Sequence, residues 1–433
     1  MDNFVKLFKE ILSAVFFGTI VSLIIYAASQ TVAYRPFLRI QNSIDDSHFM
    51  RRFLLRGAVD STTDQIVIVD IDDRSIEALG RFKYWKRRHF GEVIGALKRD
   101  GARLTFLDVI LMDGGSYRDN RALADSIRSA GNVLSGYYFN LDAPSVKHRP
   151  LDPVYNERLS SGVLYPDATN GIDFIKGEQI VLPYAGLVVS VRGLGFTNYI
   201  PDPDGVVRHI PLYISYGRIL YPSASLQLWL YLKGLRYSKV RISPNGIRFG
   251  ETVIPTDRHC FMRINYAGKQ RAFRTVSFID VLNGDVEPGV FEGKIAMIGS
   301  SSEKLNDIKE IPGYNALPGV EIHASALATL LGGRFLHVSS GNIALAITLV
   351  SGILSSLIFS FAPPVRIGLP AVIGIPLALY AYAVYSFVVH ARLINISLPL
   401  FVTILLYVVI TIHRIVEVYE AKHRESKDPG LIT

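Results

Sequence analysis

Hydrophobic residues gather at the two ends of this chain, where four long apolar runs stand out. No charged residue occurs between Glu10 and Arg35, and three further runs follow Phe335. A membrane-spanning helix needs roughly 20 apolar residues, and three such runs in succession are not found in one soluble core. The pattern therefore predicts transmembrane helices at residues 11–33, 341–362, 366–389 and 393–413. The alternative for the first run is a cleaved signal peptide. An uncleaved anchor is favoured because the run exceeds the roughly 7–15 residues of a signal-peptide core.

Basic residues flank the apolar runs mainly on one side of the predicted membrane: Lys6, Lys9, Arg366, Arg414, Lys422, Arg424 and Lys427. Loops that stay in the cytoplasm carry an excess of lysine and arginine. The pattern therefore predicts a cytoplasmic N-terminus at residues 1–10 and a cytoplasmic tail at 414–433. Residues 34–338 are then extracytoplasmic, and the expected location is a bacterial inner membrane, with this domain periplasmic or extracellular.

The pattern between the apolar ends predicts an α/β fold. The continuous β-branched run at residues 65–72 is typical of a buried parallel strand, and further strands are expected at 104–110, 132–139 and 293–300. Helices are expected between the first three strands, at 75–79, 90–98 and 121–130, and after the last strand, at 319–331. Asp204-Gly205, Asn245-Gly246 and Phe249-Gly250 indicate turns of a β-rich insertion, with a hairpin at the first. A polar segment, 35–60, is expected to be helical and to lead from the membrane into the domain.

Charge and cysteine content narrow the possible functions. The chain has 433 residues and a net charge of +8, which fits membrane-flanking lysine and arginine. No arginine-rich tract with interleaved aromatics occurs, so nucleic acid is not an expected partner. The only cysteine is Cys260, which excludes an intrachain disulfide and a CxxC metal motif.

Several ordered segments carry a resemblance to a known family: IVDIDDRS at 68–75, WKR at 85–87, LDVIL at 107–111, GFTN at 195–198, PDGVVR at 203–208, FEGKI at 291–295, IGSS at 298–301, Asp307 and PGVEIHA at 318–324. Together they resemble the CHASE type 2 family, the cyclase/histidine-kinase-associated sensory extracellular domains. The resemblance covers roughly residues 35–412 and includes one anchor before the domain and three helices after it. It implies a sensory domain and a homodimer.

The chain departs from the family in two places. Tyr84 stands where the family commonly has a proline before the tryptophan. Family members often continue into a cytoplasmic cyclase, kinase or phosphatase domain, whereas this sequence ends at Thr433, soon after the last predicted helix. Any enzymatic output is therefore expected from another polypeptide or from a part outside this sequence.

Acidic residues lie at or near the ends of two of the predicted parallel strands: Asp70, Asp72, Asp73 and Asp108. We expect these two strands to be adjacent and to deliver the acids to the carboxyl edge of the sheet, where ligands of open α/β folds bind. A divalent cation such as Mg²⁺ or Ca²⁺ held by Asp70, Asp72 and Asp108 is one possibility. The alternatives are that Asp72 and Asp73 cap the next helix, and that Asp108 pairs with Arg74 or Arg87.

An organic ligand at this edge is the other possibility, with the candidate residues Asp72, Arg87, Asp108, Ser300, Asp307 and His323. The serine loop after Gly299 is either an anion-binding turn or plain turn chemistry. His323 is either a pH-responsive group or a hydrogen-bonded, partly buried histidine. No catalytic triad or nucleophile motif is present, so no catalytic residue is assigned and the chain is not expected to be an enzyme.

Three functions are compatible with these patterns. The first is a sensor or input module whose output domain lies elsewhere. The second is a structural or docking subunit of a membrane complex, and the third is a cation-dependent extracytoplasmic hydrolase. The expected partners are the lipid bilayer, a second copy or another membrane protein, and a separate cytoplasmic effector. The helical extension at 413–425 either carries motion to that effector or merely anchors the last helix.

Overall fold

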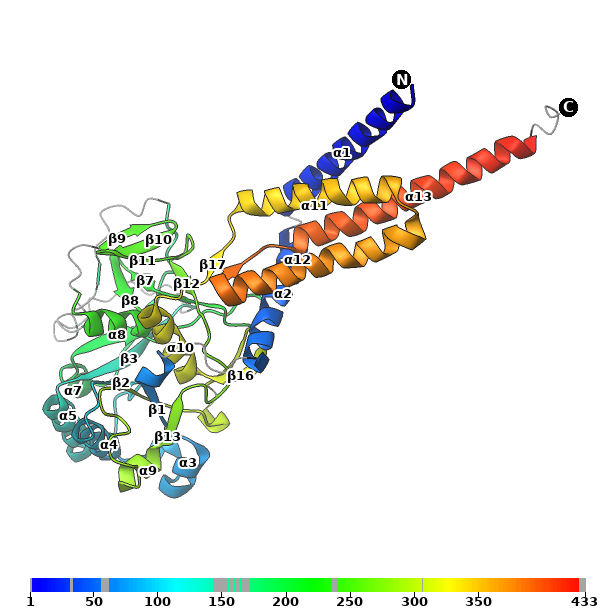
Figure 1. Ribbon diagram of the computed structural model, residues 1–433. Helices are drawn as coiled ribbons and strands as arrows, with labels where there is room; N and C mark the ends of the chain where they lie inside the picture. Colours follow the sequence, from blue (N-terminus) through cyan, green and yellow to red (C-terminus); the bar gives the residue numbers. More distant parts are fainter. Residues whose placement is uncertain are drawn as a thin grey trace. The chain divides into compact units, whose positions relative to one another are not determined.

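A computed structural model describes residues 2–31, 34–55, 62–142, 155, 159, 163–164, 171–235, 240–305 and 307–427 (Figure 1). The chain forms two compact units. One combines the N-terminal residues Met1–His48 with the C-terminal residues His337–Thr433, and the other is Phe49–Leu336. The helix α2 (Tyr34–Leu55) contributes to both, and it confirms the helix expected at the start of 35–60.

The larger unit is built on a mixed sheet, which has seven strands among the described residues. The order is β13-β1-β14-β2-β3-β4, and β5 also pairs with β3. All neighbours are parallel except β3 and β4. The strands are β1 (Ile66–Asp70), β2 (Leu104–Leu107), β3 (Val133–Asn140), β4 (Gln179–Val181), β5 (Gly193–Phe196), β13 (Arg274–Ser277) and β14 (Ile295–Gly299).

The expectation that the two acid-bearing strands are adjacent is wrong. β14, which comes almost two hundred residues after β2, lies between β1 and β2. Asp70 is in register with Gly299 of β14, and Leu107 is in register with Ile298. The pattern of each strand is local, whereas the strand order depends on contacts across the whole domain. The late completion of the sheet is nevertheless confirmed.

Helices pack on the sheet, and α4 does so through an apolar stripe. Phe90, Val93, Ile94 and Leu97 of α4 are buried in one cluster with Val67 and Val69 of β1. α10 packs on β14, β1 and α8. Besides the end of α2, the described residues of this unit form the helices α3 (Asp73–Leu79), α4 (Arg88–Arg99), α5 (Tyr117–Ala130), α7 (Ala185–Val188), α8 (Ala224–Lys233), α9 (Phe278–Asn283) and α10 (Gly319–Gly332), with short 3₁₀ turns η1 (Thr63–Gln65), η2 (Phe82–Tyr84) and η4 (Glu303–Leu305).

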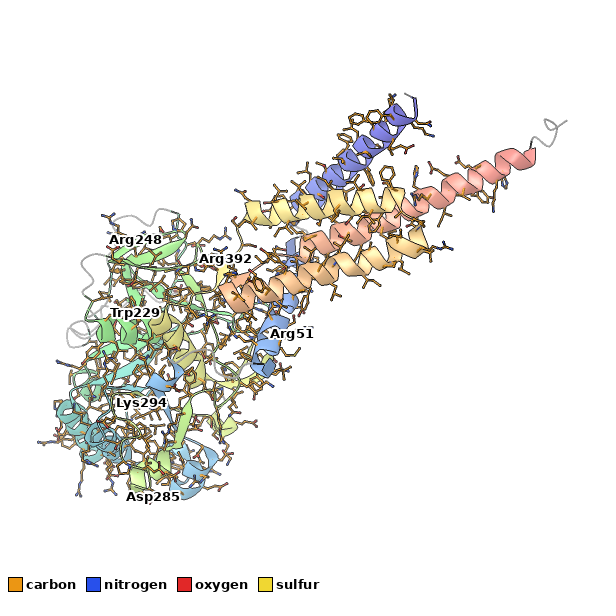
Figure 2. The ribbon with its side chains drawn as sticks, in the orientation of Figure 1. Arg51, Trp229, Arg248, Asp285, Lys294 and Arg392 are labelled. Atoms are coloured by element: carbon orange, nitrogen blue, oxygen red, sulfur yellow. The ribbon has the colours of Figure 1, made fainter. Side chains whose placement is uncertain are left out.

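Short antiparallel strands form the predicted β-rich part. β9 (Val240–Ser243), β10 (Gly246–Phe249) and β11 (Thr252–Ile254) turn at Asn245-Gly246 and Phe249-Gly250, as expected. Trp229 of α8, labelled in Figure 2, is buried and lies 5.5 Å from the ring of Phe249. The other pairs are β6 (His209–Pro211) with β12 (Phe261–Arg263), β7 (Tyr213–Tyr216) with β8 (Ile219–Pro222), and β15 (Ile308–Ile311) with β16 (Tyr314–Pro318).

The turn at Asp204-Gly205 exists, but it does not join a hairpin. Gly205 N donates to Asp202 O, which closes the turn. The strand after it, β6, pairs with the distant β12 instead of the segment before the turn. Arg208 stabilises the turn through ion pairs with Asp202 and Asp204 at 2.6 and 2.9 Å. The predicted turn is therefore confirmed, and the predicted hairpin is wrong.

The smaller unit is helical, and four of its helices are long and apolar enough to cross a membrane: Asn3–Ser29, Gly341–Phe361, Pro364–His390 and Ser397–His423. They correspond to the four predicted spans. The elements are α1 (Asp2–Ser29), α11 (Gly341–Phe361), the π-helical turn η5 (Pro364–Gly368), α12 (Leu369–His390) and α13 (Ser397–Lys427), with the strand pair β17 (His337–Val338) and β18 (Arg392–Leu393).

Small residues let α1 and α11 approach closely. Ser22 Oγ of α1 donates to Gly18 O and also to Thr348 O of α11, at 2.7 and 3.2 Å. A Cβ added at Gly352 would lie 2.0 Å from Ser22 Oγ. In membranes, helices associate through such close packing because lipid offers no hydrophobic driving force between them. The first and second spans are therefore packed as a pair.

Candidate functional site

Polar side chains meet at the carboxyl edge of the sheet. Asp70 ends β1, and Asp108 directly follows β2. A serine loop, Ser300 to Ser302, follows β14, and Tyr199 lies three residues after β5. Because these strands are parallel, their ends lie at the same edge. In open α/β sheets, ligands bind outside this edge.

The serine loop holds the acids that follow β1. Ser301 donates to both carboxylate oxygens of Asp70, from its amide at 2.8 Å and its hydroxyl at 2.6 Å. Ser302 Oγ donates to Asp73 at 2.7 Å, and Ser300 Oγ donates to Ile71 O at 2.9 Å. Burial raises the pKa of Asp70, and the bonds from Ser301 oppose that shift. The loop's hydroxyls and amides are thus used to tie β14 to β1.

Asp72 caps the helix α3. Its Oδ1 accepts from Ser75 N at 2.9 Å, from Ser75 Oγ at 2.6 Å and from Ser277 Oγ at 2.9 Å. An aspartate before the first turn satisfies amide groups that have no partner inside the helix. The capping interpretation of Asp72 is confirmed, and the cap also connects α3 to the end of β13.

A second group combines Asp108, Asp307, Tyr199 and His323. Tyr199 Oη donates to Asp307 Oδ1 at 2.7 Å, and Gly319 N at the start of α10 donates to Asp307 O at 2.8 Å. Burial, followed by the charge of Asp307, raises the pKa of Asp108 well above its usual value. Burial also raises the pKa of Tyr199. The group therefore contains one carboxylate, one carboxyl group that favours its protonated form and one phenol.

His323 faces this group from α10 and is almost completely buried, at 1% exposure. Its Nε2 lies 3.1 Å from Thr197 O, which makes Nε2–H the donor and leaves Nδ1 as an acceptor. Nδ1 has no hydrogen-bond partner among the described residues. Burial lowers the pKa of His323 to about 4, and the charge of Asp307 opposes that shift. The histidine is thus neutral near pH 7.

Comparison with known proteins supports a sensory role. The family model described as the CHASE2 domain matches residues 19–359. This chain belongs to the CHASE2 domain family. CHASE2 domains are sensory extracellular domains, so the chain is a membrane protein with a sensory domain. No curated protein and no solved structure matches the chain.

The alternative in which Asp108 of this CHASE2 domain pairs with Arg74 or Arg87 is not supported, because both arginines have other partners. Arg74 pairs with Asp280 at 2.9 Å, and not with Asp108. Arg87 donates to Asn120 Oδ1 at 3.0 Å and to Met112 O, and its guanidinium lies 4.6 Å from the ring centre of Tyr184. Of the six ligand candidates, the structure brings Asp108, Asp307 and His323 together. Asp72 and Ser300 lie at the same edge, and the contacts of Arg87 are with other residues.

The proposed cation ligands do not form one set. In the parts of the chain that the structure describes, no group of three or more histidine, cysteine, aspartate or glutamate residues is arranged to hold a metal ion. Asp70 and Asp72 accept hydrogen bonds from serines, and β14 separates β1 from β2. The divalent cation at Asp70, Asp72 and Asp108 therefore stays a prediction without geometric support.

Sequence reasoning missed two residues of this edge. Tyr199 directly follows the GFTN segment, but nothing local shows that its hydroxyl meets Asp307, which lies 108 residues later. Glu321 is buried in the first turn of α10, and both its oxygens accept from Arg271 N at 3.0 Å. Burial raises the pKa of Glu321 to about 7. A glutamate among apolar residues at a helix start was the available signal.

Proposed function

We propose that this chain is the input module of a transmembrane signalling system, without catalytic activity of its own. The CHASE2 domain would lie outside the cytoplasm of a bacterial cell, and both termini would lie inside, at the inner membrane. The observation that carries the proposal is a CHASE2 match that runs from the first candidate span into the second. Basic residues near the chain ends support the orientation.

We propose Asp108, Asp307, Tyr199 and His323 as the sensing group. The support is chemical: the group offers a carboxylate, a carboxyl donor and a neutral imidazole acceptor at the ligand-binding edge of a parallel sheet. Such a set matches a small polar ligand with both donors and acceptors. The unpartnered Nδ1 of His323 supports a ligand, because a buried acceptor left unpaired is costly.

The polypeptide chain connects this group directly to the membrane helices. His323 lies in α10, and the chain runs from the end of α10 at Gly332 through residues 333–340 into α11. A ligand that binds one position of α10 better than another shifts the population of α10 positions by its differential affinity. We propose that α11 and α13 pass this shift to a separate cytoplasmic effector.

Thermal shift of the full chain in lipid nanodiscs tests the sensing group. The probes are a panel of polar metabolites, including amines, carboxylic acids and sugars, and Mg²⁺ and Ca²⁺ alone. A stabilising compound is then measured on Asp108→Asn, Tyr199→Phe and the control Tyr117→Phe, whose side chain is 78% exposed. We expect the first two variants to weaken the shift by about tenfold in ligand concentration, and the control to keep it.

A compound that stabilises all variants equally would contradict the assignment of this group. A stoichiometric partner that co-purifies from native membranes, together with Asp108→Asn and Tyr199→Phe variants that signal normally, would favour the docking-subunit function instead. Hydrolysis that requires Asp72 and Asp108 would favour the third function.

A further inference from the structure

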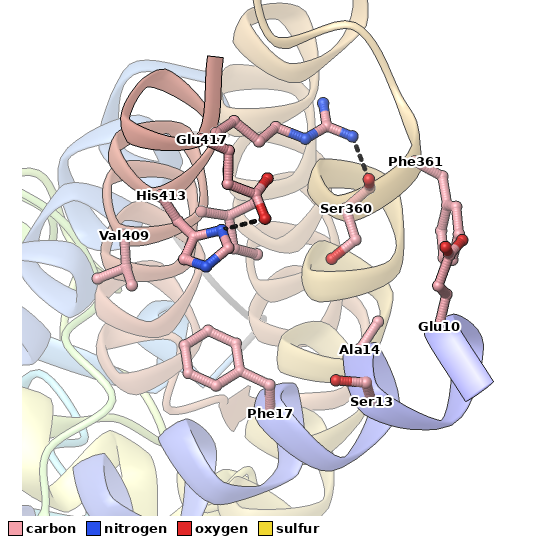
Figure 3. Close-up of a pocket in the computed structure, with 11 residues that line it drawn as sticks. Glu10, Ser13, Ala14, Phe17, Ser360, Phe361, Val409, His413 and Glu417 are labelled. Carbon is pink, nitrogen blue, oxygen red and sulfur yellow. Dashed lines mark hydrogen bonds and ion pairs between the residues drawn. The ribbon is translucent and has the colours of Figure 1, made fainter. Parts of the chain in front are cut away.

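The membrane unit contains a cavity where α1, α11 and α13 meet. α1 and α11 cross closely at Gly18 and Gly352 and separate toward the N-terminus of α1 (Figure 1). The cavity that opens there is open on one side and has a volume of about 550 Å³, within the range of about 300–1,000 Å³ typical of small-molecule sites. Figure 3 shows its lining, of which the argument uses Glu10, Phe17, Val409, His413, Arg414 and Glu417.

The cavity lies at the depth of lipid headgroups. Glu10 is nineteen residues before Ser29, the end of α1, which corresponds to about 28 Å of helix. Arg414 donates to Ala362 O and Ser360 O, so this part of α13 is level with the end of α11. The hydrocarbon core of a bilayer is roughly 30 Å thick. With Ser29 placed at the opposite edge of this core, Glu10 and Arg414 lie at the boundary between hydrocarbon and headgroups.

The polarity of the lining changes along the membrane normal. Phe17 and Val409 lie about two helical turns closer to the bilayer centre than Glu10 and Glu417, respectively. In Figure 3, His413 is drawn between the ring of Phe17 and the carboxylate of Glu417. The cavity is apolar toward the bilayer centre and charged at its outer end, which we call the mouth. This polarity matches an amphiphile.

The charges at the mouth favour a cationic group. Glu10 has no ion pair among the residues that the structure describes. Glu417 lies 3.7 Å from His413 Nδ1, which is cationic only when protonated. Arg414 is already bonded to two carbonyl oxygens at the end of α11, where a cation complements the helix dipole. The lining thus offers a cation two carboxylates, one from α1 and one from α13.

We propose that this cavity binds a phospholipid with a primary-ammonium headgroup, of the phosphatidylethanolamine type. The ammonium group, with three N–H donors, binds at the mouth, where Glu10 of α1 and Glu417 of α13 supply carboxylates. The acyl chains leave along Phe17 and Val409. The lipid then fixes the separation of the first and last spans, which makes the input module sensitive to the headgroup composition of the membrane.

Native mass spectrometry of the full chain in detergent tests the proposal. The protein is incubated with equal amounts of dioleoyl phosphatidylethanolamine, phosphatidylcholine and phosphatidylglycerol. We expect one phosphatidylethanolamine to be retained about tenfold more strongly than either competitor, because choline lacks N–H donors and glycerol carries no cation. Glu10→Gln and Glu417→Gln each reduce retention by about tenfold, and Glu420→Gln, one turn beyond the cavity, does not.

Two further arms keep the test decisive. Ser13→Leu fills the cavity without changing a charge, so it must also reduce retention. Free phosphoethanolamine, without acyl chains, must bind much more weakly than the lipid. Retention that does not depend on the headgroup, retention that survives all three cavity variants, or equal binding of free phosphoethanolamine would each overturn the proposal.

Discussion

Gly319 lies directly against the carboxylate of Asp307: a Cβ added at Gly319 would lie 2.2 Å from Asp307 Oδ2. The same glycine donates its N–H to Asp307 O at 2.8 Å. Gly319, at the start of α10, and Asp307, which accepts from Tyr199, are therefore in van der Waals contact. Any ligand that moves Asp307 must also move the first turn of α10.

Gly319→Ala is expected to displace Asp307 and to lower the free energy of unfolding by about 1–3 kcal/mol, the usual cost of overpacking. Urea unfolding of the full chain in detergent measures it through tryptophan fluorescence, because Trp85 and Trp229 are the only tryptophans and both lie in the CHASE2 domain. The control is Gly95→Ala in α4, where the added Cβ meets only the tip of Arg99. There we expect no loss, since alanine favours helix. An unchanged Gly319→Ala protein would contradict the fit.

Glu321 makes stability depend on pH in a defined direction. Its pKa rises from 4.5 to about 7 on folding, mainly through burial. The folded protein then holds this proton more tightly than the unfolded chain does. The stabilising contribution is complete below pH 4.5 and is lost as the pH rises to 7, by at most about 3 kcal/mol. We expect urea unfolding to show that the unmodified protein loses stability relative to Glu321→Gln between pH 4.5 and 7. Parallel curves of unfolding free energy against pH for the two proteins would contradict the assignment.

His323 gives the stability of the protein the opposite pH dependence. Burial lowers its pKa from 6.5 to about 4, so the folded protein disfavours the charged imidazole. Its contribution is complete above pH 6.5 and is lost as the pH falls to 4, again by at most about 3 kcal/mol. His323→Gln keeps a donor for Thr197 O and removes the titration. We expect this variant to resist acid better than the unmodified protein in urea unfolding at pH 4–6.5, and greater acid sensitivity would refute the argument.

The contact between the first two spans gives a further prediction. Gly352→Leu would collide with Ser22 and Gly18 and separate α1 from α11. Gly374→Leu in α12 is the matched control, because nothing lies within 4 Å of its added Cβ. Thermal aggregation in detergent should occur at a lower temperature for Gly352→Leu alone. Equal temperatures for the two variants would show that this contact does not hold the helices.

Local patterns predicted the parts of the molecule that depend on local forces. The four apolar helices, the strand at Ile66–Asp70 and the Asp72 cap follow from hydrophobicity, β-branching and capping chemistry within a few residues. The insertion of β14 between β1 and β2 could not be read in this way, because strand order depends on long-range pairing.

The candidate site was likewise predicted from the sequence only in part. Asp108, Asp307 and His323 were singled out by type and position, but their neighbour Tyr199 was not, and Arg87 was included although its contacts are with Asn120 and Tyr184. Which side chains meet at a sheet edge depends on the conformations of loops that start from different strands. A single sequence carries no direct signal for such contacts.

The extracytoplasmic location of the CHASE2 domain is tested by the accessibility of single cysteines in intact cells. Cys260 is buried, at 1% exposure, and can remain in place. Arg218→Cys lies in the exposed turn between β7 and β8, and Lys422→Cys lies on the exposed end of α13. With a membrane-impermeant maleimide, we predict labelling of Arg218→Cys in intact cells and of Lys422→Cys only after permeabilisation. Labelling of Lys422→Cys alone in intact cells would place the CHASE2 domain inside the cell and contradict its role as an external sensor.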